Sequence, residues 1–169
     1  MIFKTKRLAV RLLQFSDINA YFDLHGNINV MQYTTGKTLT FEQTRKNLKA
    51  TINYYKIPNN KYQIWAIQLL KNPELIGTCA IISTDQKNEI GYRLRENYWT
   101  KGYGEEIAKG LIKYCFEDLK LDSIFADADV LNIASVKILD KTMDFVKEYY
   151  IAAEDCTARE YRLTNTQIN

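Results

Sequence analysis

The sequence has little of the residues that most often build metal sites and nucleophilic triads. Its 169 residues include one histidine, His25, and three widely spaced cysteines, Cys79, Cys115 and Cys156. One histidine leaves almost no material for a metal centre or a histidine-based triad, so we expect no metal site. Three scattered cysteines do not make a disulfide framework, and we expect them reduced, as in a cytoplasmic protein.

Long apolar runs and an excess of one charge are also missing. No apolar stretch is long enough to span a bilayer or to act as a secretory signal, so we expect no membrane partner. The net charge is only +3, with both signs interspersed, which is too mild to indicate nucleic-acid binding. Hydrophobic residues make up 46% of the chain, which is ordinary for a globular protein, and we expect a single domain over residues 1–169.

The spacing of apolar residues and breakers predicts an α+β chain. Expected strands cover 7–13, 62–70, 75–83, 89–94, 124–130 and 161–163, and expected helices cover 16–26, 40–55, 102–118 and 132–141. Hairpins followed by one strand–helix–strand crossover predict a mixed, mostly antiparallel sheet with helices on both faces.

Local signals refine this outline. Ser16 suits the N-cap of the first helix, and Thr40 opens a capping box for the second. We expect a loop after Gly26 and a turn at residues 72–74. His25 falls in the last turn of the first helix, where a partly charged imidazole suits the helix dipole.

Two glycines stand where a strand is expected to give way to a helix, in Tyr-Trp-Thr-Lys-Gly-Tyr-Gly-Glu-Glu-Ile at 98–107. Unpaired amides at a helix start, with glycines that let a ligand approach, make a seat for a phosphate or diphosphate at about residues 100–105. Lys101 adds a positive charge. An isolated Gly-x-Gly would be better explained as a tight turn. The chain has no P-loop, and Ile107 replaces the third glycine of a dinucleotide fingerprint.

Three segments in order resemble one family. Residues 99–104 resemble the acetyl-CoA loop Gln/Arg-x-x-Gly-x-Gly/Ala of the GNAT N-acetyltransferases, and the Tyr-Trp start is similar to the RimJ/RimL-like branch, which acetylates ribosomal-protein N-termini. Residues 132–141 resemble that branch's Asn-x-x-Ser-x-x-x-Leu-Glu-Lys segment, and residues 5–8 its Thr-x-Arg-Leu start. The resemblance covers about residues 4–148.

The resemblance implies a GNAT fold and an enzyme that moves an acetyl group from acetyl-CoA to a primary amine, by direct transfer through a tetrahedral intermediate. The acceptor would be a protein or peptide N-terminus or a small amine. The implied cofactor contacts are main-chain groups of Leu94, Arg95, Thr100, Lys101, Gly102, Tyr103, Gly104 and Glu105, and the side chain of Asn132. Ser135 would be a proton donor near the thioester sulfur, and Glu89 a general base.

Each of these roles has a structural alternative. Asn132 and Ser135 also suit a helix cap after a strand. Glu89 is equally well explained as a solvated charge at a strand end, because an ordinary glutamate is a poor base for an ammonium unless burial raises its pKa. Tyr103 suits packing against the next helical turn. For the whole chain, the alternative is a non-catalytic acyl-CoA-binding module, with nucleic-acid binding a distant third.

The chain departs from the family after Leu139, where the usual glycine is absent and one residue is added. One interpretation is a helix that runs on toward Tyr149 and Tyr150. This region usually shapes the acceptor side of the cleft, so the acceptor of the RimJ/RimL-like branch does not transfer directly. Tyr149, Tyr150 and Tyr161 suit core packing first, and otherwise an acceptor pocket or a homodimer contact.

Overall fold

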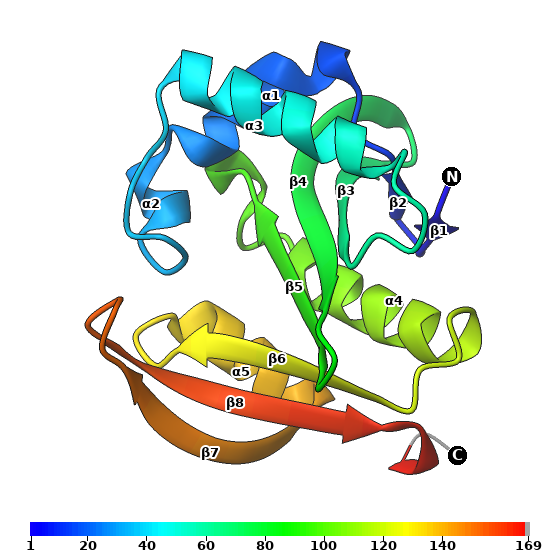
Figure 1. Cartoon of the computed structure of the whole chain (residues 1–169), viewed down its shortest axis with the longest axis vertical. Coiled ribbons are helices and arrows are strands. Elements are labelled where there is room, and N and C mark those ends of the chain that lie inside the picture. The colour runs from blue at the N-terminus through cyan, green and yellow to red at the C-terminus, as the bar shows by residue number, and fades with distance from the viewer. Residues whose placement is uncertain (168–169) are drawn as a thin grey trace.

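The computed structural model describes residues 1–167 as one eight-stranded sheet in the order β1-β2-β3-β4-β5-β6-β8-β7. The strands are β1 (Phe3–Lys4), β2 (Leu8–Arg11), β3 (Tyr62–Leu69), β4 (Asn72–Ser83), β5 (Asn88–Leu94), β6 (Ser123–Asp129), β7 (Asp144–Ile151) and β8 (Cys156–Thr164). The helices are α1 (Ile18–His25), α2 (Ile28–Met31), α3 (Phe41–Tyr54), α4 (Tyr103–Glu117) and α5 (Ile133–Thr142), with 3-10 turns η1 (Phe15–Asp17), η2 (Glu96–Tyr98) and η3 (Asn165–Gln167). The expected mixed sheet with flanking helices is confirmed (Figure 1).

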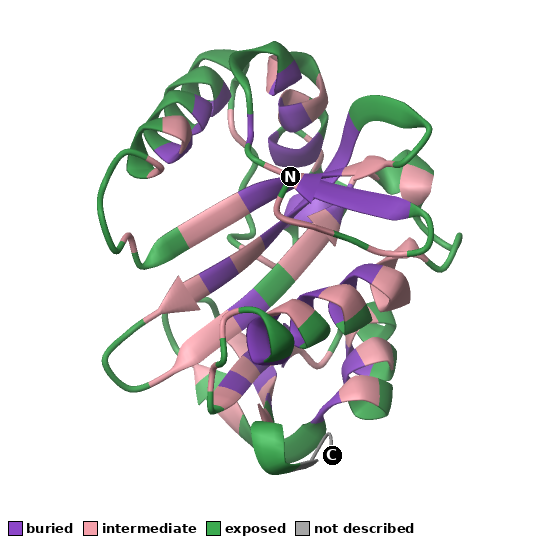
Figure 2. Ribbon diagram, turned by 90° about the vertical axis from the view of Figure 1, so that its right-hand side faces the viewer, coloured by how far each residue is buried: buried purple, intermediate pink, exposed green. Residues whose placement is uncertain are grey.

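Two apolar cores lie on opposite faces of the sheet. On β3, Trp65 and Ile67 join the core under α4 and α5, whereas Ala66 joins the core under α1 and α3. This alternation follows from the two-residue repeat of a strand. Figure 2 shows the result as buried segments along the strands and exposed outer faces on the helices. Cys115 lies in the first core, as the helical pattern predicts.

The sheet opens between β5 and β6. These strands run parallel and form one ladder pair, Glu89 with Phe125, whereas β5 pairs with β4 at seven positions and β6 with β8 at seven. Beyond that pair β5 and β6 diverge (Figure 1). The sheet therefore holds a wedge-shaped gap that widens toward the C-terminal ends of both strands.

The interpretation that the last helix runs on toward Tyr150 is wrong. Helix α5 ends at Thr142, and β7 follows as a strand that pairs with β8. Met143 follows the helix in an extended backbone conformation, and its side chain lies in the core with 6% exposure. Tyr161 is fully buried, as core packing predicts, but Tyr150 is 61% exposed on β7.

Several local expectations also need correction. Ser16 is not a cap, since η1 precedes α1 and Gln14 caps η1. The loop after Gly26 contains α2, and the turn expected at residues 72–74 is part of β4, which pairs with β3 through two register shifts. The two-residue strand β1 has no pattern long enough to predict.

His25 lies in the last turn of α1, as expected, but it is 7% exposed rather than solvated. Its Nδ1 lies 3.0 Å from the Tyr21 carbonyl oxygen, which makes Nδ1 the protonated nitrogen. Burial lowers the pKa of His25 to about 4. The imidazole is therefore neutral at pH 7, and the expected charge–dipole contact is wrong.

Candidate active site

The glycine loop joins the end of β5 to the start of α4. The indole Nε1 of Trp99 donates to the Leu94 carbonyl oxygen at 2.8 Å, which fixes the start of the loop against the last residue of β5. Thr100 and Gly102 both have positive φ angles, 60° and 75°. Glycine suits the second position because it takes this conformation without a steric penalty. The chain thus turns sharply twice before α4 begins.

Six consecutive amides of this loop have no acceptor in residues 1–167. The first helical bond of α4 runs from the Glu106 amide to the Gly102 carbonyl oxygen at 3.2 Å, and the Trp99 amide before the loop bonds the Glu96 carbonyl oxygen. The N–H groups of residues 100–105 lie between these two bonds and have no partner in the chain. They gather at the positive end of a 15-residue helix, which is the arrangement that binds anions.

A partly buried carboxylate, that of Glu106, braces the loop from behind. Glu106 Oε1 accepts from Thr5 Oγ1 at 2.6 Å and from the Arg7 amide at 2.7 Å, and Oε2 accepts from Arg7 Nε at 2.5 Å. Arg7 Nη1 donates to the Lys101 carbonyl oxygen at 3.0 Å, and the guanidinium lies over the Tyr103 ring. Burial alone would raise the pKa of Glu106, but the hydrogen bonds from Thr5 and Arg7 lower it. The Thr-x-Arg segment therefore holds the first turn of α4.

The other charges of the loop are arranged to favour an anion. Glu105 is paired with Lys109 at 2.6 Å and Lys141 at 3.6 Å, and the hydrogen bond from Lys109 lowers the pKa of Glu105. Two lysines thus offset the negative charge on the first helical turn. Lys101 folds back, with Nζ donating to the Asn97 carbonyl oxygen at 2.7 Å, and remains beside the loop.

The second glycine serves packing. A Cβ on Gly104 would lie 3.1 Å from Ile138 Cδ1 and 3.4 Å from a ring carbon of Tyr92. The backbone of α4 can therefore approach α5 and β5 closely, and this brings the loop to the mouth of the gap. Tyr103 packs against the Arg7 guanidinium and the edge of the core.

A cavity of about 70 Å³ lies in the gap between β5 and β6. Its lining comes from β5, β6, α4 and α5, and includes Gly91, Tyr92, Asp127 and Ser135. Burial raises the pKa of Tyr92 to about 12, and a hydrogen bond with Ser135 opposes that rise. Asn132 caps α5, with Oδ1 accepting from the Ser135 amide at 3.2 Å, so the cap role is confirmed and only the Asn132 side-chain nitrogen is left for a ligand.

A cluster of carboxylates faces the gap from the other side of the sheet. Glu89 lies on β5 and shares its face with Asp127 of β6 and Glu160 of β8, by the pairing of these strands. Lys87 Nζ lies 3.3 Å from Asp127, 3.7 Å from Glu89 and 3.6 Å from Glu160. Burial raises the pKa of Glu89, and the charge of Asp127 adds to the rise. Glu89 is thus a better base than a solvated strand-end charge.

Asp127 has a buried oxygen, Oδ1, with no hydrogen-bond partner in the described residues. A buried carboxylate oxygen without a donor is costly, and it marks a place where a ligand's N–H group would be bound. Tyr149 also lies near this carboxylate, and burial followed by the Asp127 charge raises its pKa to about 12. Of the tail tyrosines, Tyr149 is therefore the one beside the gap.

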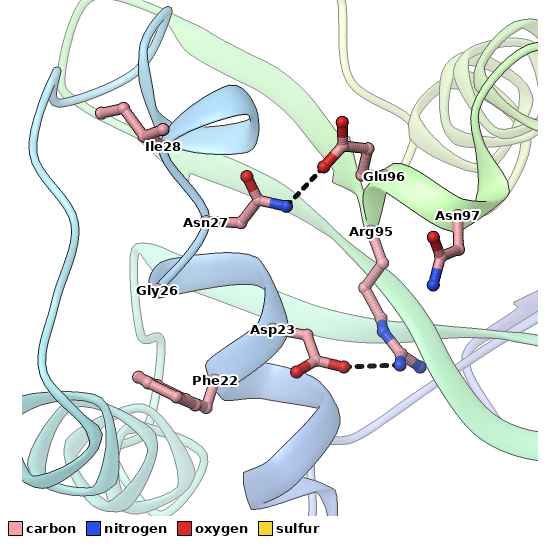
Figure 3. A pocket seen from close by; sticks show the side chains of 8 residues that line it. All are labelled: Phe22, Asp23, Gly26, Asn27, Ile28, Arg95, Glu96 and Asn97. Carbon is pink, nitrogen blue, oxygen red and sulfur yellow. Dashed lines mark hydrogen bonds and ion pairs between the residues drawn. The ribbon is translucent and has the colours of Figure 1, made fainter.

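Arg95 lies apart from the gap. Its amide donates to the Ile76 carbonyl oxygen at 2.9 Å and its carbonyl oxygen accepts from the Tyr98 amide, so both main-chain groups already have partners. Its guanidinium contacts Asp23 at 2.6 Å and Glu74 at 2.5 Å, on the wall of an open hollow of about 540 Å³ between α1 and η2 (Figure 3). The expected main-chain contact of Arg95 with the cofactor therefore has no free group in this structure. Leu94 keeps its amide for that role.

Comparison with known proteins identifies the family of this chain. The sequence profile described as "Acetyltransferase (GNAT) domain" matches residues 7–142. The "Uncharacterized N-acetyltransferase p20" of Bacillus licheniformis is 30% identical over 147 residues, which cover 85% of this chain and 82% of p20. The chain belongs to the GNAT acetyltransferase family. Acetyl-CoA is accordingly its cofactor, and the non-catalytic module is set aside.

Solved structures show the same GNAT fold. An acetyltransferase of the GNAT family from Bacillus anthracis superposes with a TM-score of 0.85 at 24% identity, over 96% of this chain and 98% of that one. RimL, a ribosomal L7/L12 acetyltransferase solved with coenzyme A, superposes with a TM-score of 0.79 at 16% identity, over 96% and 97% of the two chains.

The GNAT site in this chain fits the cofactor. A diphosphate needs several N–H donors, and residues 100–105 offer six free amides. A slender amide-containing arm needs a path with polar edges, and the gap between β5 and β6 offers unpaired strand edges leading to the cavity. A Cβ on Gly102 would lie 3.4 Å from Arg7 Nη2, so the loop is also tight against its brace.

The sequence singled out Glu89 and Ser135 but missed Tyr92, Asp127, Lys87 and the bracing role of Arg7. Asp127 carried a usable signal, because an acid alternates with alanines in an otherwise apolar strand. Tyr92 and Lys87 carried none, since only the pairing of β5 with β6 brings them to the gap. Within residues 1–167, no helix is long and apolar enough to cross a membrane.

Proposed function

We propose that this GNAT enzyme acetylates a primary amine that approaches from the carboxylate face of the β5–β6 gap. The observation that carries the proposal is the separation of two kinds of group across this gap. The Glu89 carboxylate lies on the face of β5 opposite to Tyr92, and Asp127 joins the Glu89 side of the gap to the cavity that Tyr92 and Ser135 line. An amine and a leaving thiolate need opposite proton transfers, so this separation suits them.

Binding of acetyl-CoA is assigned to the main chain. The amides of Thr100, Lys101, Gly102, Tyr103, Gly104 and Glu105 bind the diphosphate, and the Leu94 amide and the Asn132 side-chain nitrogen bind the pantetheine arm. Acetyl-CoA supplies the activated acyl group as a thioester. Because the donors are already held in place by the helix start and by the Glu106–Arg7 brace, little conformational entropy is lost when the cofactor binds.

Proton movements are assigned to side chains. An amine must be neutral to attack, and Glu89, with its raised pKa, accepts the ammonium proton directly or through water. Asp127 Oδ1 orients the amine as a hydrogen-bond acceptor. Ser135 donates a proton to the departing sulfur and regains one, through water, from the attacking nitrogen, which loses its second proton as the amide forms. Tyr92 orients the Ser135 hydroxyl.

Thiol release from acetyl-CoA across a panel of primary amines tests this function. At least one amine should release coenzyme A with the acetylated amine as a product seen by mass spectrometry. Binding of acetyl-CoA without thiol release for any amine would contradict it. Replacement of Ser135 by alanine should lower kcat by about a hundredfold, with unchanged acetyl-CoA affinity. An equal loss in Tyr92→Phe alone would move the donor role to Tyr92.

We further infer a cytoplasmic homodimer. Strand β7 forms the sheet edge and exposes Phe145, Val146 and Tyr150 by 53%, 46% and 61%. An exposed apolar edge strand is a ready surface for a second chain. Light scattering should give twice the chain mass, and Val146→Lys should give the monomer. A monomeric wild type would contradict this.

A further inference from the structure

Arg93 is a partly buried cation without a counter-ion. It lies on β5, and the only side-chain hydrogen bond that it forms within residues 1–167 runs from Nη1 to the thioether sulfur of Met31 at 3.3 Å. No carboxylate of the described residues forms an ion pair with it. Its neighbours are neutral, because His25 has lost its proton and the Tyr21 hydroxyl donates to Asn47.

Two other arginines, Arg11 and Arg95, have mostly buried side chains, and both are paired. Arg11 binds Asp17 with both terminal nitrogens at 2.8 Å, and Arg95 binds Asp23 and Glu74. Removing an ion from water without a partner is unfavourable. Burial lowers the pKa of Arg93, but a guanidinium keeps its proton in proteins. The guanidinium of Arg93 thus stays charged although its burial disfavours the charge. An anion from outside the chain would offset this unfavourable free energy.

Open space lies beside Arg93. Gly91 is exposed although β5 is a central strand, and a Cβ placed on it would meet nothing within 4 Å. By the strand repeat, Glu89, Gly91 and Arg93 share one face, and the first and last of them lie about 13 Å apart along β5. We call the open strip over Gly91 the channel, and it has carboxylates at one end and a guanidinium at the other.

We propose that the acceptor is an amine that also carries a carboxylate, and that Arg93 binds this carboxylate while the amine lies toward Glu89 and Asp127. This rests on the proposed function and specifies its substrate class. A planar guanidinium matches a carboxylate through two parallel hydrogen bonds. A phosphate carries more charge, and three carboxylates around Lys87 would repel it in this channel. Arg93 is thus a specificity-determining residue.

Matched acceptor pairs test the proposal. Free amino acids and short peptides are compared with their carboxamides, and an aminoalkyl phosphate is included. The acids should have kcat/KM values at least about tenfold higher than their amides. Arg93→Gln should remove this preference through KM for the acids, leaving the amides and the acetyl-CoA affinity unchanged. Arg45→Gln is the matched control, because Arg45 is an exposed arginine paired with Glu42 on α3.

A second readout does not depend on turnover. Accepted acids should raise the Tm of the wild type, with acetyl-CoA absent, and should not raise that of Arg93→Gln. Should Arg93→Gln fail to fold, Arg93→Lys keeps the charge without the planar fork and should lose most of the acid preference.

Equal rates for acids and amides, a preference that survives in Arg93→Gln, or a preference for the phosphate would overturn the proposal. Failure of the proposed function is distinct from these outcomes, since no amine of any kind would then release thiol.

Discussion

Glu106 and Arg7 lie 99 residues apart in the sequence and bind each other through both the side chain and the main chain of the arginine. This pair joins the strand region at the N-terminus to the first turn of α4. It leaves the loop amides free for a ligand, since Arg7 supports the loop through the Lys101 carbonyl oxygen instead.

Removal of this brace should cost stability. Arg7→Met leaves the Glu106 carboxylate, whose side chain is 15% exposed, without its cation. We expect a free energy of unfolding lower by about 1–3 kcal/mol in urea titration. Arg45→Met removes an exposed pair on α3 and should cost less than about 0.5 kcal/mol. Equal losses in the two variants would show that Arg7 braces nothing.

The left-handed conformation of Gly102 should matter for cofactor binding, and Gly36 provides a matched control. Both glycines have positive φ, 75° and 66°, so alanine costs each about 1–2 kcal/mol of stability. Only Gly102→Ala displaces the free amides, and it should weaken acetyl-CoA binding at least about tenfold by calorimetry. Similar acetyl-CoA affinities in the two variants would argue against the loop as the diphosphate site.

The raised pKa of Glu89 gives a signed pH dependence. As a base, Glu89 must be ionised, so kcat/KM should fall as the pH drops through a value above the ordinary glutamate pKa of 4.5. Glu89→Gln should lower kcat and remove this fall of kcat/KM at low pH, which a pH–rate profile measures.

The stability of the same variant checks the explanation. A carboxyl whose folded-state pKa is raised stabilises the fold below its unfolded pKa and loses that contribution as the pH rises. Glu89→Gln should therefore be no less stable than the wild type at pH 7. If kcat/KM of Glu89→Gln still falls at low pH, another residue is the base, and Asp127 would be the next residue to test.

The lone histidine permits a direct titration. The folded-state pKa of His25 is about 4, below the ordinary histidine value of 6.5, because burial disfavours the charged form. Its contribution to stability is present above pH 6.5 and is lost as the pH falls toward 4. The single imidazole resonance in NMR should titrate near pH 4 in the folded state, and a midpoint near 6.5 would show that His25 is solvated.

The elements that depend on short-range sequence patterns were predicted correctly. The alternation of Ile124, Ala126 and Ala128 predicted β6, and the apolar line through Ile107 and Leu111 predicted α4. The sequence did not predict features that depend on tertiary contacts. Helix α5 ends before Met143, where the chain turns extended and goes on to pair with β8, and no local breaker marks that point.

The candidate site likewise has a part that the local sequence predicts and a part that depends on long-range contacts. The glycine loop is local, so the positions of its amides followed from residues 98–107. The channel of Glu89, Asp127 and Arg93 depends on how β5 and β6 pair and diverge, which is a long-range property. The unpaired state of Arg93 depends on what every other segment places beside it, and no sequence pattern reports that.

The proposed mechanism depends on the amides of residues 100–105, which bind the diphosphate of acetyl-CoA. The most direct test is an NMR titration of the ¹⁵N-labelled protein with coenzyme A and, separately, with pantetheine, which lacks the diphosphate. Coenzyme A should shift these six amide resonances strongly and pantetheine should not, while both should shift residues around the cavity. Shifts of the loop amides that are equal for the two ligands, or absent for coenzyme A, would contradict the account.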